Sequence, residues 1–412
     1  MFARHLEPRI DAALEGSPAV FLQGARQCGK STLVQELAER RGLAYVTLDD
    51  AGALAAARSD PQGFVAGFDA PVVIDEVQAA PMLFPAIKAA VDRKRTPGRF
   101  LLTGSANALV VPELSRSLVG RVELLSLRTL SQGELEGVAG SFVDALFTSA
   151  APRAKPAPIG DLAARVTTGG YPEAVARKTS ERRAAWFDAY VTTILQRDVR
   201  DLANVDGLHH LPQLLRLVAA RAASMVNFAE LSRALAVPQT SLKRYFALSE
   251  AVFLVQRVPA WSTNLGKRFA RSPKLFLLDS GLASHLQGVD AASWTEPATR
   301  RGALLENFVF GELEKQLGWS TVRAQLYHFR SHAGEEVDFV LEDPKGRIVG
   351  VEVKASSTLS SSDVAPLKKL SKELGKRFVR GVVLYAGDAI VPFDEHVHGV
   401  PVSALWGGFN RL

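Results

Sequence analysis

A glycine-rich motif near the N-terminus constrains the fold of this 412-residue chain more than any other feature. Residues 24–31 match the pattern G-x-x-x-x-G-K-[ST] in full, and they follow an apolar segment at residues 19–22. Such a turn between a strand and a helix presents backbone N–H groups to phosphate, while its Lys and Ser reach the β- and γ-phosphates and Mg²⁺. The motif predicts a parallel α/β sheet with a site for ATP and Mg²⁺. The residues expected around the phosphates are Gly24, Ala25, Arg26, Gln27, Cys28, Gly29, Lys30, Ser31 and Thr32.

Two acidic residues follow another apolar segment. Residues 72–74 are typical of a buried parallel strand, and Asp75 and Glu76 come at its carboxyl end, where such sheets hold their ligands. We expect Asp75 to support the Mg²⁺ shell and Glu76 to activate the attacking water as general base. A solvated acidic loop is the alternative interpretation.

A third apolar segment, residues 99–103, ends in Thr103, and Gly104 and Ser105 follow. This polar tip is placed to orient the water or to contact the γ-phosphate, and ordinary turn chemistry is the alternative. The three segments together predict a sheet with an extra strand between the two phosphate motifs. That arrangement is typical of P-loop proteins that hydrolyse their nucleotide.

Arginines further along the chain are candidates for catalysis across a subunit interface. We expect Arg121, with Arg116 as a second candidate, to neutralise transition-state charge in a neighbouring subunit, which predicts a homo-oligomer. A solvated cation at a helix end is the alternative for both. Arg197 and Arg200 are weaker candidates for phosphate contacts, because ion pairs at i,i+4 spacing explain their segment equally well.

Composition is that of a soluble globular chain with room for several domains, since 47% of residues are hydrophobic and 22% are charged. Charged residues interrupt the N-terminus, and we expect no signal peptide, no membrane span and a cytoplasmic location. A single cysteine, Cys28, excludes an intrachain disulfide. Its position in the phosphate loop predicts an accessible thiol whose alkylation blocks nucleotide binding.

A basic region occupies the middle of the chain. Residues 211–275 contain ten Lys and Arg against two Glu, a net charge of +8 compared with +6 for the whole chain. The pattern predicts helices at 227–235 and 239–255 and a hairpin of 254–258 with 274–278, which together form a winged helix. A winged helix binds DNA through its second helix and its wing, and a protein-binding or packing module is the alternative. The candidate DNA contacts are Gln239, Thr240, Lys243, Arg244, Lys267 and Arg268.

Acidic residues on two neighbouring segments mark the C-terminal region. Residues 336–340 and 349–354 alternate like strands, and a hairpin between them brings Asp338 close to Glu352. Two carboxylates with Lys354 beside them suit Mg²⁺-dependent phosphodiester hydrolysis, with Glu306 as a further metal ligand. An edge strand with a charged outer face, or a nuclease-like fold kept for binding, is the alternative.

The ordered set of motifs resembles a prokaryotic family of AAA-type P-loop ATPases with a C-terminal region of unknown function. The motifs that carry the resemblance lie at residues 24–31, 73–76, 102–105, 169–172, 197–200, 261–268 and 336–340. The resemblance implies an α/β fold in which a P-loop ATPase domain with parallel sheet and helical lid precedes a winged helix and a PD-(D/E)xK nuclease-like α/β domain. The expected divisions are 1–140 for the ATPase core, 141–205 for the lid, 206–295 for the winged helix and 296–412 for the nuclease-like domain.

The sequence therefore predicts an ATPase that couples turnover to binding or remodelling of DNA. Two other interpretations stay open. One is a nucleotide-switched protein-binding scaffold without nuclease activity, and the other is an ATP-dependent, metal-dependent DNA nuclease.

Overall fold

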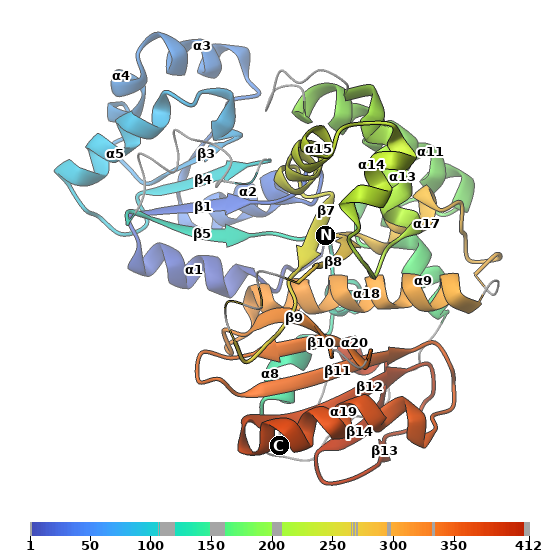
Figure 1. Cartoon of the computed structure of the whole chain (residues 1–412). Coiled ribbons are helices and arrows are strands. Elements are labelled where there is room, and N and C mark those ends of the chain that lie inside the picture. The colour runs from blue at the N-terminus through green and yellow to red at the C-terminus, as the bar shows by residue number, and fades with distance from the viewer. Residues whose placement is uncertain are drawn as a thin grey trace.

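A parallel sheet, a largely helical middle region and a mixed C-terminal sheet follow one another along the chain (Figure 1). The structure is a computed structural model. It describes residues 2–105, 107, 120–148, 161–199, 208–264, 266, 268, 271–294, 298–331 and 334–407.

The N-terminal sheet has five strands, all parallel, in the order β2-β3-β4-β1-β5. The strands are β1 (Ala19–Gln23), β2 (Ala44–Thr47), β3 (Val72–Asp75), β4 (Phe100–Gly104) and β5 (Val122–Ser126). Strand β4 lies between β1 and β3, so the predicted extra strand between the two phosphate motifs is confirmed. The carboxyl ends of β1, β3 and β4 consequently meet at one edge of the sheet.

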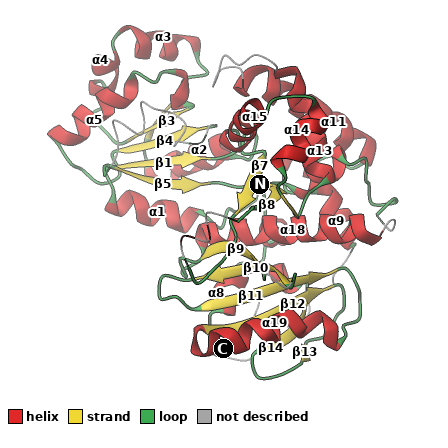
Figure 2. Cartoon of the chain, viewed as in Figure 1, coloured by secondary structure: helices red, strands yellow, loops and turns green. Residues whose placement is uncertain are grey.

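Helices cover both faces of this sheet, because its central strands are apolar on both sides (Figure 2). Side chains such as Phe21, Ile74 and Leu102 pack on one face, and Val20, Leu22 and Leu101 pack on the other. The helices of this region are α1 (Glu7–Gly16), α2 (Lys30–Arg41), α3 (Ala51–Ser59), α4 (Pro61–Ala66) and α5 (Leu83–Arg93).

Short helices connect the sheet to the middle region. They are α7 (Gln132–Glu136), α8 (Phe142–Leu146), α9 (Leu162–Thr168) and α10 (Pro172–Val175), before the longer α11 (Ser180–Thr193). A cluster of aromatic rings fixes α11, with Tyr190 stacked on Trp186 and tilted against Tyr171. The motif at residues 169–172 therefore has a packing role at the base of α11.

The middle region has the order helix, strand, helix, helix, strand, strand. Its elements are α13 (Leu211–Ala220), β6 (Ser224–Met225), α14 (Phe228–Leu235), α15 (Gln239–Ala251), β7 (Val255–Val258) and β8 (Lys274–Leu277), and helix α17 (Ser280–Leu286) follows. The predicted hairpin is confirmed, since β7 pairs antiparallel with β8. The predicted helix at 239–255 was too long at its end. Phe253 adopts a positive φ of 59°, which turns the chain into β7.

The C-terminal sheet has six strands in the order β13-β14-β12-β11-β10-β9. Strands β9 (Gln325–Arg330), β10 (Glu336–Glu342) and β11 (Ile348–Lys354) are antiparallel, whereas β12 (Phe378–Tyr385) runs parallel to β11 and β14 (Val397–Pro401). The predicted hairpin of residues 336–340 with 349–354 is confirmed by the pairing of β10 with β11. The remaining elements are β13 (Val391–Pro392), α19 (Ser361–Leu374) and α20 (Ala404–Gly407).

Helix α18 (Ala298–Trp319) lies between the C-terminal sheet and the rest of the chain (Figure 1). Its buried Gln316 accepts a hydrogen bond from the backbone N–H of Phe142 at 2.6 Å and donates to the carbonyl of Leu405 at 2.8 Å. Its Lys315 donates to the carbonyl of Leu130 at 2.9 Å. These buried contacts join the end of the ATPase region to the C-terminal domain through one helix.

In the part of the chain that the structure describes, no helix combines the length and apolar character needed to cross a membrane.

Candidate ATP site and neighbouring charged clusters

The phosphate loop joins the carboxyl end of β1 to α2 in the predicted strand–loop–helix order. Gly29 caps α2 with a φ of 99°, a conformation that favours glycine. A Cβ on Gly24 would lie 2.2 Å from the carbonyl oxygen of Leu127, so no side chain fits there. The two glycines of the motif are therefore required by the backbone path as well as by close approach to a phosphate.

Lys30 begins α2 and is buried. Its ammonium group donates to the carbonyls of Gly24 and Ala25 at 3.0 and 2.9 Å. The ammonium therefore lies over the loop, where the motif requires a cation for phosphate. Ser31 is half-buried and Thr32 is exposed, at the N-terminus of a helix whose first N–H groups are available to an anion.

Asp75 ends β3 and is buried, and two hydroxyl groups hold its carboxylate. The hydroxyl of Thr103, at the end of β4, donates to Oδ1, and that of Tyr45 donates to Oδ2 at 3.0 Å. Burial, followed by the charge of Asp75, raises the pKa of Tyr45 to about 12, so this hydroxyl keeps its proton at neutral pH. Tyr45, on β2, was missed by the sequence reasoning because nothing near it in the chain marks it.

Glu76 follows directly, in a left-handed conformation with a φ of 56°. The hydroxyl of Ser105 donates to both of its carboxylate oxygens, at 3.0 and 3.1 Å, and the amide of Gln78 donates to Oε2. The hydroxyl of Thr103 accepts from the backbone N–H of Glu76 at 3.0 Å. Thr103 thus ties the two acids together, as expected of a polar tip at this strand end, and Gln78 is a further contact that the sequence reasoning did not find.

The oxygen set of Ser31 and Asp75 is the kind that Mg²⁺ prefers, and both residues lie at the sheet edge where the loop turns into α2. A P-loop fold of this type implies nucleotide binding, with Mg²⁺ as the usual metal. The roles of the individual residues stay predictions.

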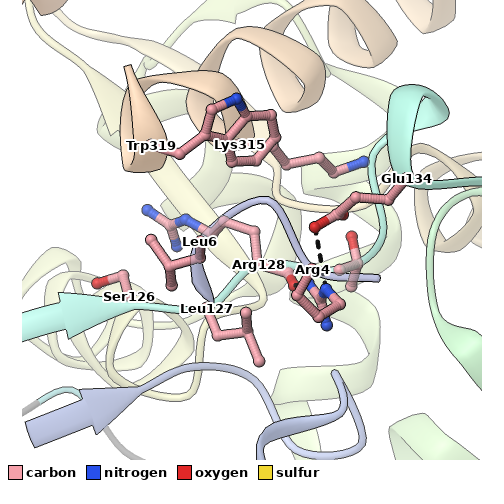
Figure 3. Close-up of a pocket in the computed structure, with 9 residues that line it drawn as sticks. Arg4, Leu6, Ser126, Leu127, Arg128, Glu134, Lys315 and Trp319 are labelled. Atoms are coloured by element: carbon pink, nitrogen blue, oxygen red, sulfur yellow. Dashed lines mark hydrogen bonds and ion pairs between the residues drawn. The ribbon is translucent and has the colours of Figure 1, made fainter. Parts of the chain in front are cut away.

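Arg4 contacts the backbone of the phosphate loop, and the sequence reasoning did not identify it. Its guanidinium donates to the carbonyl of Cys28 at 2.8 Å and to that of Arg128 at 2.7 Å, and it pairs with Glu134 at 3.0 Å (Figure 3). Burial would raise the pKa of Glu134, but the charge of Arg4 and hydrogen bonds from nearby N–H groups lower it below its usual value. The pair lines a small pocket together with Lys315 and Trp319.

The thiol of Cys28 is fully buried, so the prediction of an accessible thiol was wrong. Its Sγ points away from solvent and donates to the carbonyl of Leu127 at 3.5 Å. The loop presents its backbone to the phosphate site, and this side chain fills the space beneath it.

Helix α11 also contacts the loop. The hydroxyl of Tyr190 donates to the carbonyl of Arg26 at 3.2 Å and lies 2.9 Å from the hydroxyl of Tyr171. The neighbouring Gly170 donates its N–H to Asp279 at 2.8 Å. The segment at residues 170–171 therefore links the phosphate loop, through hydrogen bonds of Tyr171 and Tyr190, to Asp279 at the start of α17.

Arg121 directly precedes β5, and so it lies at the edge of the sheet opposite the phosphate loop. Its guanidinium pairs with Asp92 at 3.1 Å on the exposed surface. It does not reach the phosphate site of its own chain. Arg116 and Arg200 lie outside the described residues, as does the side chain of Arg197.

The predicted DNA-contacting residues have different surroundings. Those at the start of α15, which are Gln239, Thr240, Lys243 and Arg244, are exposed. Arg268 is not, because its guanidinium pairs with Glu342 at 2.6 Å and lies over the ring of Tyr327. Its side chain is only 10% exposed, so the predicted DNA contact by Arg268 was wrong. Lys267 lies outside the described residues.

The predicted metal ligands of the C-terminal domain hold lysines. Asp338 and Glu306 both bind the ammonium of Lys274, at 3.1 and 2.8 Å, while Glu352 binds that of Lys354 at 2.8 Å. Burial, followed by the charge of Asp338, raises the pKa of Glu352 to about 8. As the described residues are arranged here, no group of three His, Cys, Asp or Glu could hold a metal ion, and lysine ammonium groups occupy the predicted site of Glu306, Asp338 and Glu352. The prediction that these acids hold a metal is therefore wrong for this arrangement.

Comparison with known proteins divides the chain into three parts. An AAA domain matches residues 16–136, and two domains of unknown function, DUF8612 and DUF4143, match residues 159–293 and 301–405. The AAA match covers the phosphate loop, Asp75, Glu76 and Thr103, and it supports ATP hydrolysis by this fold.

Among solved structures, similarity extends to the Walker-type ATPase PABY2304 of Pyrococcus abyssi, at 14% identity and a TM-score of 0.44 over 70% of this chain and 96% of the other. It also extends to the Holliday junction branch migration motor RuvB of Thermotoga maritima, at 17% identity and a TM-score of 0.30 over 63% and 90%. Both TM-scores are low, so neither likeness bears on the function of this chain.

Two curated relatives match nearly the whole chain. The uncharacterized proteins Rv2008c of Mycobacterium tuberculosis and Mb2031c of Mycobacterium bovis are each 32% identical over 404 residues, which is 98% of this chain and 84% of theirs. The chain therefore belongs to the family of these mycobacterial proteins, and in it an AAA-type P-loop ATPase domain precedes two domains of unknown function.

Proposed function

We propose that this protein hydrolyses ATP at the sheet edge formed by β1, β3 and β4 and uses the turnover to bind or remodel DNA. One observation supports ATP hydrolysis. Four residues lie together at one edge of the parallel sheet: Lys30, Asp75, Glu76 and Thr103. In this proposal Lys30 contacts the phosphates, and Ser31 and Asp75 hold the Mg²⁺ that offsets phosphate charge.

Glu76 is the general base of this proposal. Its carboxylate is held by Ser105 and Gln78, which are neutral donors, so its position is fixed without an ion pair. Oε1 accepts a hydrogen bond from Ser105, and its second lone pair can accept one from the attacking water. Thr103 fixes the backbone of Glu76 and the carboxylate of Asp75 at the same time, and so it orients the base relative to the metal ligand.

The observations that support DNA binding lie in the middle region. Its element order, helix, strand, helix, helix, strand, strand, is that of a winged helix, in which α15 takes the place of the recognition helix. The exposed start of α15 carries Lys243 and Arg244 together with Gln239 and Thr240, side chains that reach phosphates and base edges.

The proposal also includes assembly of the chain into a homo-oligomer. Arg121 lies at the sheet edge opposite the phosphate loop, so it can act on a nucleotide only across an interface between two copies of the chain. In that arrangement Asp92 would have to release Arg121 when the neighbouring subunit binds ATP.

The test is the steady-state ATPase rate with single-stranded, duplex and branched DNA, with Glu76→Gln as the inactive reference. We expect one form of DNA to stimulate the rate, and the double reversal Lys243→Glu, Arg244→Glu to remove both the stimulation and salt-sensitive DNA binding. The reversal of two exposed lysines on the far side of the chain, Lys372→Glu and Lys376→Glu, is the matched control for net charge. An ATPase rate and a DNA affinity that respond equally to both reversals would contradict α15 as the DNA contact.

A second candidate is a nucleotide-switched scaffold that binds another protein. The packing of the segment between β7 and β8 favours it, because the backbone N–H of Trp261 donates to the carbonyl of His328 at 2.6 Å and Arg268 pairs with Glu342. This part of the expected wing is thus packed on the C-terminal sheet. A steady-state ATPase rate that no form of DNA changes would favour this candidate.

A further inference from the structure

A buried lysine from the middle region occupies the acidic cluster of the C-terminal domain. Lys274 is the first residue of β8, and its side chain is 2% exposed. Strand β8 packs against α18 (Figure 1), and the lysine extends to carboxylates of α18 and β10. It belongs to a different domain match from the acids that it binds, since the matches cover 159–293 and 301–405.

Three carboxylates surround its ammonium group. The Nζ atom lies 2.8 Å from Glu306, 2.6 Å from Glu336 and 3.1 Å from Asp338. Burial alone would lower the pKa of Lys274, but the charges of Asp338, Glu306 and Glu336 raise it well above its usual value. The three acids therefore supply the counter-charge of this buried ammonium group.

Two further carboxylate oxygens near Lys274 also have partners. The second oxygen of Asp338 accepts from the backbone N–H of Val353 at 2.9 Å, and Glu352 holds Lys354. A divalent cation would bind the same oxygens of Asp338 and Glu306 that Lys274 binds, and two cations cannot share them in a buried space. Access for a metal thus requires that Lys274 leaves.

We propose that Lys274 is a built-in counter-cation that closes the carboxylate cluster of the C-terminal domain to divalent metal. Because the lysine belongs to β8, the cluster opens when its side chain swings out or when β8 moves relative to α18 and β10. The proposal concerns neither ATP hydrolysis nor DNA binding, and it holds whether or not the proposed function is correct.

The first experiment measures Mn²⁺ binding to the full-length, nucleotide-free protein by electron paramagnetic resonance. We expect Lys274→Met to gain one Mn²⁺ site, at least about tenfold tighter than any site in the wild type, since three carboxylates lose their counter-charge. The gain should disappear in Lys274→Met, Asp338→Asn. Lys315→Met is the matched control, because Lys315 is also buried but pairs with one acid, Glu312.

The result that would overturn the proposal is a wild-type Mn²⁺ site of the same affinity that Asp338→Asn removes. A folded Lys274→Met that gains no site would overturn it as well.

A second experiment needs no variant at Lys274. Brief treatment of the folded wild type with an amine-reactive acylating reagent, followed by peptide mass spectrometry, compares Lys274 with the exposed Lys243. We expect Lys274 to react at least about tenfold more slowly, because its ammonium is buried and paired. Equal rates would show that the lysine does not occupy the cluster in solution.

Discussion

One carboxylate cluster of this protein lies at the strand ends of the N-terminal sheet, and the other lies between α18 and the C-terminal sheet. The two clusters differ in what holds them. Asp75 and Glu76 receive hydrogen bonds from hydroxyl and amide groups, those of Thr103, Tyr45, Ser105 and Gln78. Glu306, Asp338 and Glu352 are held by the ammonium groups of Lys274 and Lys354. Neutral donors fix a carboxylate and leave its charge for a metal or a proton, whereas an ammonium group neutralises it.

The acids near the phosphate loop are thus held by neutral groups, whereas those of the C-terminal domain are paired with ammonium groups in this conformation. At the phosphate loop the cation that the motif supplies, Lys30, rests on carbonyl oxygens and not on the acids. In the C-terminal domain the cation rests on the acids themselves. The following changes test the contrast.

The largest effect is expected from Glu76→Gln. The amide keeps the shape of the side chain but cannot accept a proton, so turnover should fall by about 10²–10⁴-fold while ATP affinity stays close to that of the wild type. Single-turnover hydrolysis and equilibrium binding of a labelled nucleotide measure the two quantities separately. Glu395→Gln, a change of an exposed acid in the C-terminal domain, is the control. Near-normal turnover in Glu76→Gln would assign the base to another residue and break the contrast.

Removal of the buried cation should destabilise the C-terminal domain. Lys274→Ala leaves the carboxylates of Glu306 and Asp338 buried without their counter-charge, which costs about 3–5 kcal/mol when one partner of such a pair is lost. Urea unfolding followed by fluorescence measures the loss. Adding Glu306→Gln to Lys274→Ala should recover part of it, and additive losses would contradict the ion-pair account.

The second cluster should make the stability of the protein depend on pH. The pKa of Glu352 in the folded protein is about 8, above its ordinary value near 4.5, so the folded state binds more protons between these limits. Its contribution to stability is complete below about pH 4.5 and is lost as the pH rises toward 8. Thermal unfolding between pH 6 and pH 8.5 should show a smaller decline for Glu352→Gln than for the wild type.

The smallest effect is expected from Cys28. Its buried thiol should resist iodoacetamide in the folded protein and react at the normal rate in urea. Cys28→Ala should change ATP turnover by less than about threefold, since the loop contacts phosphate through its backbone. Rapid modification of the native thiol with loss of nucleotide binding would show that the loop opens around Cys28 and would restore the prediction of an accessible thiol.

Local spacing in the sequence was enough for much of the fold. The phosphate motif, the acids after a buried apolar segment and the alternation at residues 336–340 and 349–354 each depend on residues close together in the chain. Strand periodicity and the loop motif are short-range signals, so they predicted β1, β3, β4 and the hairpin of β10 with β11.

What the charged residues contact was decided by the tertiary structure. Lys274 and Arg268 counted as part of a basic surface, yet they bind acids 64 and 74 positions away, while Arg4 binds Glu134 across 130 positions. Charge alone predicts solvent exposure, and only packing shows which cation loses its water to a partner. The sequence by itself thus determined a P-loop sheet with its acids in place. The fold decided that Cys28 is buried, that Arg4 supports the loop and that Lys274 fills the second acidic cluster, because each of these depends on contacts between segments far apart in the chain.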